Sequence, residues 1–422
     1  MTRSPTVRTL ENGVTLICDP VPGFETLALS VVAGRGARWE GEAQSGWSHL
    51  LEHMVFKGAA NRSAREIVEA IENGGGQLNA ATGHERTSFQ VRALAGGLPL
   101  AMEITADLVQ RPTLDPDDLG REKHVVQQEI AEAADTPDDQ VFEQAQSAAF
   151  AGQPLGRPIL GSAASLAPVT SSGIEAWRAA IYAPDRLVVS VAGAVDEVHF
   201  LALAQERFAS APTRAGVAAT PAKFEGGVAA ETRKLEQAHL VFLLPGPGVS
   251  DPHYWALRLF AEVLGGGMSS RLFQEARERL GLAYAIDAYA DAYADVGVLG
   301  IYAGCAAKDA GRLAQVAAGE LRGLTTRVEA GELARGKAQL KASLFMGRES
   351  LLARAEQAAA QYLAYGRLMP AAEIAASIDA VTVDDLIALG REVLAPGRCA
   401  VSVLGPKTAS VAGARFEAAL FG

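Results

Sequence analysis

The chain of 422 residues exceeds what one hydrophobic core ordinarily serves, so it predicts two domains of about 200 residues each. Hydrophobic residues form 49% of the sequence and charged residues 21%, a balance that excludes wholesale disorder. The 49 acidic and 38 basic residues give a net charge of −11, which argues against nucleic acid as the main partner. The 3 cysteines lie far apart in the sequence, which disfavours a disulfide framework and a cysteine-based zinc site.

The N-terminal segment predicts the edge of a folded sheet. The residues from Thr9 to Ile17 have the pattern of a strand, an Asn-Gly turn and a second strand. A cleaved signal would carry an apolar region instead, and no run of about 18 apolar residues occurs in the chain. We therefore expect a cytoplasmic protein that does not interact with membranes.

The segment from Ser45 to Gly58 predicts a short helix with a metal-binding face. Ser45 is expected to cap its start, and Gly58 follows its end. His49 and His53 are four residues apart, so their imidazoles lie about 40° apart around the helix and can share a tetrahedral zinc. The carboxylate of Glu52 can reach a water on that zinc. The alternative is a surface helix with two incidental histidines, but the neighbouring apolar residues place the motif near a core.

A second helix and a hairpin are predicted after this motif. Ser63 and Glu66 have the spacing of a capping box, and Gly74 is expected to end the helix that they open. Strand-forming residues on both sides of Gly83 then predict a β-hairpin.

A long helix is predicted from Asp115 to Glu132, with Asp115 as N-cap and Pro116 at the first helical position. Glu122 and Glu129 are seven residues apart and therefore share one face of this helix. Considered alone, such helical glutamates are more often solvated surface charges than metal ligands.

The two halves of the chain resemble each other. A shift of 212 residues aligns the segment 169–193 with 381–405, and 10 of these 25 positions are identical. Each copy predicts an amphipathic helix, an Ala-Pro stop and an apolar strand. Convergence of similar helix–strand units is the alternative, but an offset of half the chain favours duplication. We expect two similar α+β domains at 1–210 and 232–422, joined by a linker at 211–231 that is rich in Ala, Gly, Pro and Thr.

The helix with the two histidines resembles one family of enzymes. The sequence HLLEHMVFKG, from His49 to Gly58, is similar to the active-site helix of the pitrilysin/insulysin zinc metallopeptidases, the inverzincins. It is most similar to their half-length branch, which includes mitochondrial processing peptidase. A stretch like that from Glu122 to Glu129 holds the family's third ligand, so the resemblance implies that Glu129 binds one Zn²⁺ per chain with His49 and His53. It further implies that Glu122 supports the site and that each domain is a mainly antiparallel sheet packed with helices.

The same resemblance extends to the hairpin and to the second half. It implies that Asn79 and Ala80 pair with the substrate backbone at a sheet edge. The segment from Leu264 to Tyr284, a glycine-rich run followed by a helix, is similar to the family's second-domain signature. By that similarity the second domain binds no metal, and Arg277 and Tyr284 reach the active site of a facing domain. There they can stabilise the charge that develops on the carbonyl oxygen.

These observations predict a zinc endopeptidase that hydrolyses unfolded peptides in an enclosed chamber, with Glu52 as general base on zinc-bound water. Full-length relatives hold four such domains, so the resemblance implies that this two-domain chain forms a homodimer. A heterodimer with a related half-length subunit is the alternative assembly. The rival function is a non-catalytic scaffold subunit, as in the respiratory-complex core proteins. Those relatives typically lose metal or base residues, whereas this sequence retains them.

Overall fold

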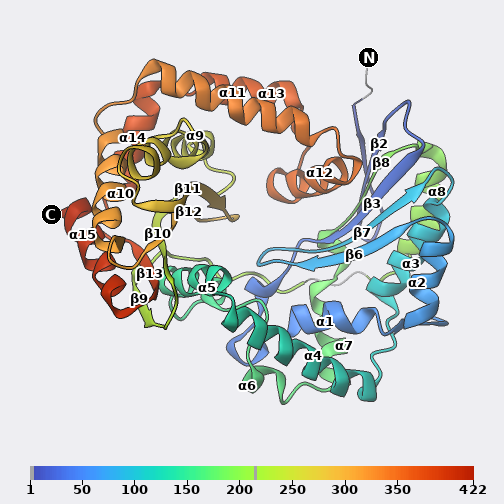
Figure 1. Ribbon diagram of the computed structural model, residues 1–422. Coiled ribbons are helices and arrows are strands. Elements are labelled where there is room, and N and C mark those ends of the chain that lie inside the picture. The colour runs from blue at the N-terminus through green and yellow to red at the C-terminus, as the bar shows by residue number, and fades with distance from the viewer. Residues whose placement is uncertain (1–3, 213–215) are drawn as a thin grey trace. The chain divides into compact units, whose positions relative to one another are not determined.

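The computed structural model describes residues 4–212 and 216–422, and the chain forms two compact units (Figure 1). Within the described residues, unit 1 is made of Met1–Ala131, Pro158–Thr220 and Met346–Pro370, and unit 2 is made of Glu132–Arg157, Pro221–Phe345 and Ala371–Gly422. No helix in the described ranges is both long enough and apolar enough to cross a membrane.

Unit 1 is built on a mainly antiparallel sheet with the strand order β1-β2-β8-β3-β7-β6. Its strands are β1 (Thr6–Thr9), β2 (Thr15–Pro20), β3 (Thr26–Ala33), β6 (Gln77–Thr82), β7 (Thr87–Leu94) and β8 (Leu187–Gly193). A separate short pair is formed by β4 (Gly58–Ala59) and β5 (Arg62–Ser63). The helices are α1 (Trp47–Val55), α2 (Ala64–Asn73), α3 (Leu98–Gln110), α4 (Pro116–Asp135), α6 (Ala163–Leu166), α7 (Ser171–Ile181), α8 (Glu197–Phe208) and α12 (Leu351–Tyr365).

Helices cover both faces of the unit 1 sheet. The main core joins one face to α1, α3, α7 and α8, while α12 lies on the other face (Figure 1). On the α12 face, Ile17, Val32 and Val188 pack against Ala359, and all four are buried. Because successive residues of a strand point to opposite faces, strands β2, β3 and β8 need an apolar cover on each side.

Unit 2 repeats this plan with the strand order β11-β12-β10-β13-β9. Its strands are β9 (Gly227–Thr232), β10 (Gln237–Gly246), β11 (Ala283–Ala292), β12 (Gly297–Ala306) and β13 (Ala400–Gly405). Its helices are α5 (Pro137–Ala149), α9 (Tyr254–Gly265), α10 (Ala310–Leu324), α11 (Ala330–Gly347), α13 (Ala371–Ala380), α14 (Val383–Leu394) and α15 (Ala412–Phe421), with a π-helix at Phe273–Arg279. Helix α5 covers one face of the sheet, where Val141 and Ala145 pack with Val241 and Leu243.

The matching strand orders confirm the prediction of two similar α+β domains. In each sheet a hairpin forms one edge, as β6-β7 in unit 1 and β11-β12 in unit 2, and each contains one parallel pair, β2-β8 and β13-β9. The aligned threonines also have equivalent places. Thr170 caps α7 and Thr382 caps α14, each through a side-chain oxygen that accepts a backbone N–H three residues later.

The units are discontinuous in sequence and therefore differ from the predicted division at 1–210, 211–231 and 232–422. Helix α5 comes from the first half but covers the unit 2 sheet, and α12 comes from the second half but covers the unit 1 sheet. Strand β9 begins inside the predicted linker. Residues 213–215 of that linker lie outside the described part of the chain. An amphipathic pattern predicts that a helix covers an apolar surface, but it does not say which surface.

Candidate metal centre

Helix α1 presents the two histidines on one side and a buried apolar face on the other. Leu50, Leu51 and Met54 are completely buried. The side chains of His49 and His53 are 15% and 18% exposed, and their ring centroids are 4.7 Å apart. The packing of the apolar face therefore fixes the direction in which both imidazoles point.

The start of α1 is stabilised from outside the helix, so the prediction that Ser45 caps it is wrong. The N-cap is Gly46, at φ 88°, and no side chain at this position accepts a hydrogen bond from the first turn of the helix. Instead the buried carboxylate of Glu40 accepts the N–H of Gly46 at 2.8 Å and that of Ser48 at 2.7 Å. A glycine is required at position 46, because a Cβ there would lie 2.6 Å from the carbonyl oxygen of Leu160.

Glu129 of α4 points at both histidines. Its Oε2 lies 3.7 Å from Nε2 of His49 and 3.6 Å from Nε2 of His53. One donor atom from each of the three residues lies within 4.8 Å of the others. Although Glu129 is partly exposed, its Oε2 is buried and has no hydrogen-bond partner among the described residues. A tetrahedral zinc with bonds of about 2.0–2.2 Å holds its ligands about 3.4 Å apart, so this donor set fits the ion and would satisfy the buried oxygen.

Glu122 lies about two helical turns before Glu129 and contacts the ring of His53. Its Oε2 is 3.1 Å from Nδ1 of His53, and its Oε1 is 2.8 Å from Nζ of Lys57. The glutamate is only 5% exposed, so the ammonium of Lys57 compensates a buried charge. A carboxylate on Nδ1 orients an imidazole so that Nε2 faces the centre.

Glu52 lies on α1 with the two histidines, and a residue of the sheet holds its carboxylate. Thr82, at the end of β6, donates a hydrogen bond from Oγ1 to Oε2 of Glu52 at 2.5 Å. Burial raises the pKa of the Glu52 carboxyl, and the bond from Thr82 and the charge of His53 oppose this shift. A carboxylate whose pKa is raised from its usual value is a better proton acceptor near neutral pH.

The electrostatic environment keeps His49 neutral. Burial, assisted by the nearby charge of His53, lowers the pKa of His49 to about 4. At neutral pH its imidazole is therefore uncharged, and one of its two ring nitrogens keeps a free lone pair. A metal ligand needs such a free lone pair.

The predicted substrate residues lie on an edge strand. Among the described residues β6 pairs only with β7, so its outer backbone groups are not used by the sheet. Asn79 is exposed, whereas Ala80 is partly buried and faces the core with Thr82. The strand that carries Asn79 and Ala80 thus leads directly to the carboxylate of Glu52.

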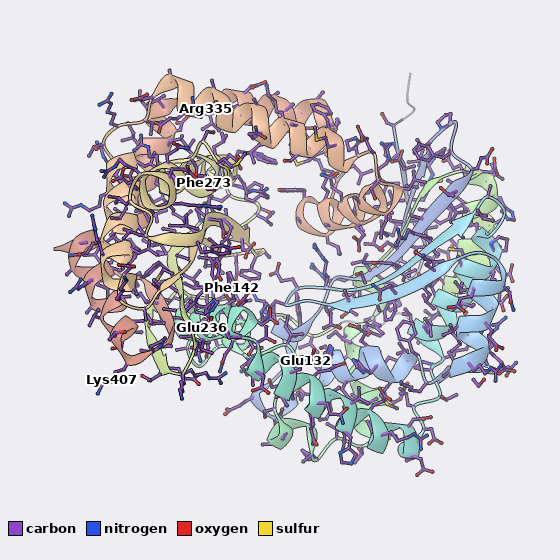
Figure 2. The ribbon with its side chains drawn as sticks, viewed as in Figure 1. Glu132, Phe142, Glu236, Phe273, Arg335 and Lys407 are labelled. Carbon is purple, nitrogen blue, oxygen red and sulfur yellow. The ribbon has the colours of Figure 1, made fainter. Side chains whose placement is uncertain are left out.

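Arg277 and Tyr284 both belong to unit 2, whereas the metal-site residues belong to unit 1. The guanidinium carbon of Arg277 lies 4.7 Å from the ring centroid of Phe273, which is labelled in Figure 2. Tyr284 is 77% exposed and occupies a β-bulge between Ala283 and Ala285. Bulges re-aim side chains and are common beside active sites, but the reach of this pair to a metal stays a prediction.

Sequence reasoning did not find Thr82, Lys57 or Glu40. Thr82 could have been found from strand alternation, since it shares a face with Ala80. Lys57 lies beyond the end of α1, and its partner Glu122 is on another helix, so helical spacing did not indicate its role. No local pattern indicated Glu40, because it reaches α1 from a preceding turn.

Comparisons with known proteins agree along nearly the whole chain. The family model described as insulinase (peptidase family M16) matches residues 19–163, and the model described as peptidase M16 inactive domain matches 168–340. An uncharacterised zinc protease of Rickettsia felis is 36% identical over 379 residues, covering 90% of this chain and 92% of the relative. An uncharacterised zinc protease of Mycobacterium tuberculosis is 34% identical over 410 residues, covering 96% of this chain and 93% of the relative.

Two solved structures share the fold. A protease from Helicobacter pylori superposes with a TM-score of 0.89 at 21% identity, covering 96% of this chain and 100% of that structure. A peptidase M16 inactive domain from Pseudomonas fluorescens gives a TM-score of 0.87 at 20% identity, covering 96% of this chain and 98% of that structure.

Proposed function

Because the chain belongs to the insulinase family of peptidases, M16, we propose that it is a zinc-dependent endopeptidase that hydrolyses unfolded peptides in an enclosed chamber. The observation that carries this proposal is the convergence of His49, His53 and Glu129 beside the half-buried carboxylate of Glu52. These three residues would hold one zinc ion per chain.

Bound zinc would supply a Lewis acid that polarises the scissile carbonyl and lowers the pKa of water. Glu52 Oε1 then accepts the proton of the attacking water while Thr82 holds Oε2, and Glu52 delivers that proton to the leaving amine. Glu122 keeps the ring of His53 in place throughout, with its charge compensated by Lys57. The backbone of β6 around Asn79 and Ala80 binds the peptide as an added strand, which requires an extended substrate.

Loss of activity on metal removal, with recovery on zinc addition, is the expected result that tests this function. The purified protein should contain one zinc per chain by elemental analysis and cleave an unstructured quenched peptide. Dialysis against a chelator should abolish cleavage, and stoichiometric zinc should restore it. Hydrolysis that survives complete removal of metal would contradict the proposal, and a protein with neither zinc nor hydrolysis would favour a scaffold function.

The proposed assembly is a homodimer in which the zinc site of one subunit is completed by the partner's Arg277 and Tyr284. Each chain carries both residue sets, so two identical subunits suffice. A guanidinium and a phenol can stabilise the negative charge that develops on the carbonyl oxygen.

Complementation between inactive variants tests the shared site. Arg277→Ala should lower turnover by about 10²–10³-fold, as for other oxyanion donors. Mixed in equal amounts with Glu52→Gln, it should recover about one quarter of the wild-type rate, since half the dimers are hybrid and each has one intact site. Mixing with a variant that carries both substitutions is the control and should recover nothing. No recovery with Glu52→Gln, despite demonstrated subunit exchange, would exclude sites shared across a homodimer.

A further inference from the structure

A cavity of about 300 Å³ lies at the β6 edge of the unit 1 sheet. Its lining residues come from β6, β7 and the first turn of α12, and they are Gln77, Leu78, Asn79, Gln90, Arg92 and Leu352. The strand register places Gln77 beside Arg92 and Asn79 beside Gln90, so these four polar side chains share one sheet face. It is the face opposite Ala80 and Thr82.

Arg92 is the charged member of this lining and has no partner in the described part of the chain. It is exposed, and its guanidinium makes neither a hydrogen bond nor an ion pair with any described residue. The nearby carboxylate of Glu356, from α12, already accepts a hydrogen bond from Nε2 of Gln90. That nitrogen is also 3.2 Å from Oγ of Ser88. The cavity therefore combines amide groups with one guanidinium that has no ion-pair partner among the described residues, while the carboxylate of Glu356 is hydrogen-bonded to Gln90.

The cavity lies along the path of a peptide added to β6. Thr82, which holds Glu52, marks the reaction end of this strand, and Gln77 lies five residues away. At about 3.3 Å per residue, Gln77 is about 17 Å from the reaction end and Asn79 is about 10 Å from it. Alternate side chains of an added strand project to the Arg92 face of the sheet, next to Gln77 and Asn79.

We propose that this cavity is a substrate subsite that favours an acidic side chain about five residues from the scissile bond. The inference rests on the proposed peptidase function, because it uses the peptide bound along β6. A carboxylate of the substrate would pair with the guanidinium of Arg92 and accept hydrogen bonds from the amides of Gln77 and Asn79. A lysine at the same place would instead be repelled by the guanidinium of Arg92.

Matched peptides that differ at one position test the subsite. Unstructured quenched peptides should carry Asp, Asn or Lys at the fourth, fifth or sixth residue on either side of one cleavage site. For wild-type protein, kcat/KM should be about three- to fivefold higher for Asp than for Lys at one of these positions, as expected of a partly exposed ion pair. Arg92→Glu should reverse this preference, and Arg92→Gln should remove it.

Arg8→Glu is the matched control, because Arg8 is exposed on β1 at the other edge of the same sheet and its replacement changes the net charge equally. This variant should keep the wild-type preference. Fluorescence anisotropy of the labelled peptides with metal-free protein gives the same comparison without turnover. The subsite is disproved if Arg92→Glu and Arg8→Glu have the same charge preference in both measurements. If no peptide is cleaved by zinc-loaded wild type, the peptidase function fails, and anisotropy still decides the subsite.

Discussion

Substitution of Glu52 by glutamine is expected to lower kcat for peptide hydrolysis by about 10²–10⁴-fold, the usual contribution of a general base. Glutamine keeps the size of the side chain and can still accept the hydrogen bond from Thr82, but it cannot take a proton from water. Since the three proposed ligands are untouched, the variant should bind zinc with wild-type stoichiometry. Steady-state hydrolysis and elemental analysis of the same preparation measure both quantities.

Two further variants distinguish the effect of Glu52 itself from the effects of neighbouring charges and hydrogen bonds. Glu42→Gln replaces an exposed carboxylate shortly before α1 and should leave turnover unchanged. Thr82→Val removes a hydrogen bond that favours the ionised form of Glu52, so the pKa of Glu52 should rise. Activity needs the ionised form, and the acidic limb of the pH–rate profile should therefore move to higher pH. Glu52→Gln turnover within a few-fold of wild type would refute the role of Glu52.

Substitution of Glu129 by glutamine is expected to weaken zinc binding more than about 100-fold and to abolish hydrolysis with it. The amide oxygen is a much poorer zinc ligand than a carboxylate, and Glu129 Oε2 is the atom that faces both imidazoles. Zinc at 100 times its dissociation constant stabilises a folded protein by about 2.7 kcal/mol. That stabilisation should raise the Tm of wild type and be absent from the variant.

Neighbouring glutamates of α4 provide a graded comparison. Glu122→Gln leaves the three ligands but weakens the hold on His53, so zinc affinity should fall about 10–100-fold. Glu132→Gln changes an exposed carboxylate, labelled in Figure 2, and should not affect zinc binding. Competition with a chromophoric chelator measures the zinc affinity of all three variants. Equal affinities for Glu129→Gln and Glu132→Gln would remove Glu129 from the proposed ligand set.

Local features of the fold were predictable because they depend on residues close in sequence. The hairpin around Gly13, the capping box of Ser63 and Glu66, and the Asp115 cap of α4 all occur as expected. The failure at Ser45 has a physical reason. The buried Glu40 carboxylate competes for the same N–H groups with a charge-assisted hydrogen bond, which is stronger than one to a hydroxyl.

In the candidate site, too, only the features that depend on residues close in sequence were predictable. The spacing of His49 and His53 on one helix is a local property, and the structure shows their rings adjacent. Bringing Glu129 to the same point needed either a family resemblance or the tertiary structure, since helical periodicity gives Glu122 and Glu129 the same face. The structure distinguishes them: Glu122 lies at Nδ1 of His53, and Glu129 lies at Nε2 of both histidines.

The sequence by itself determined the paired histidines, the duplicated helix–strand units and the α+β class, since each follows from periodicity and capping within a few turns of chain. Only the tertiary structure decided that α5 and α12 each cover the sheet of the other half, and that Thr82 and Lys57 support the carboxylates of Glu52 and Glu122. These contacts join residues far apart in sequence or on different elements. Their choice depends on which apolar surfaces and buried charges remain uncovered after the local elements have formed.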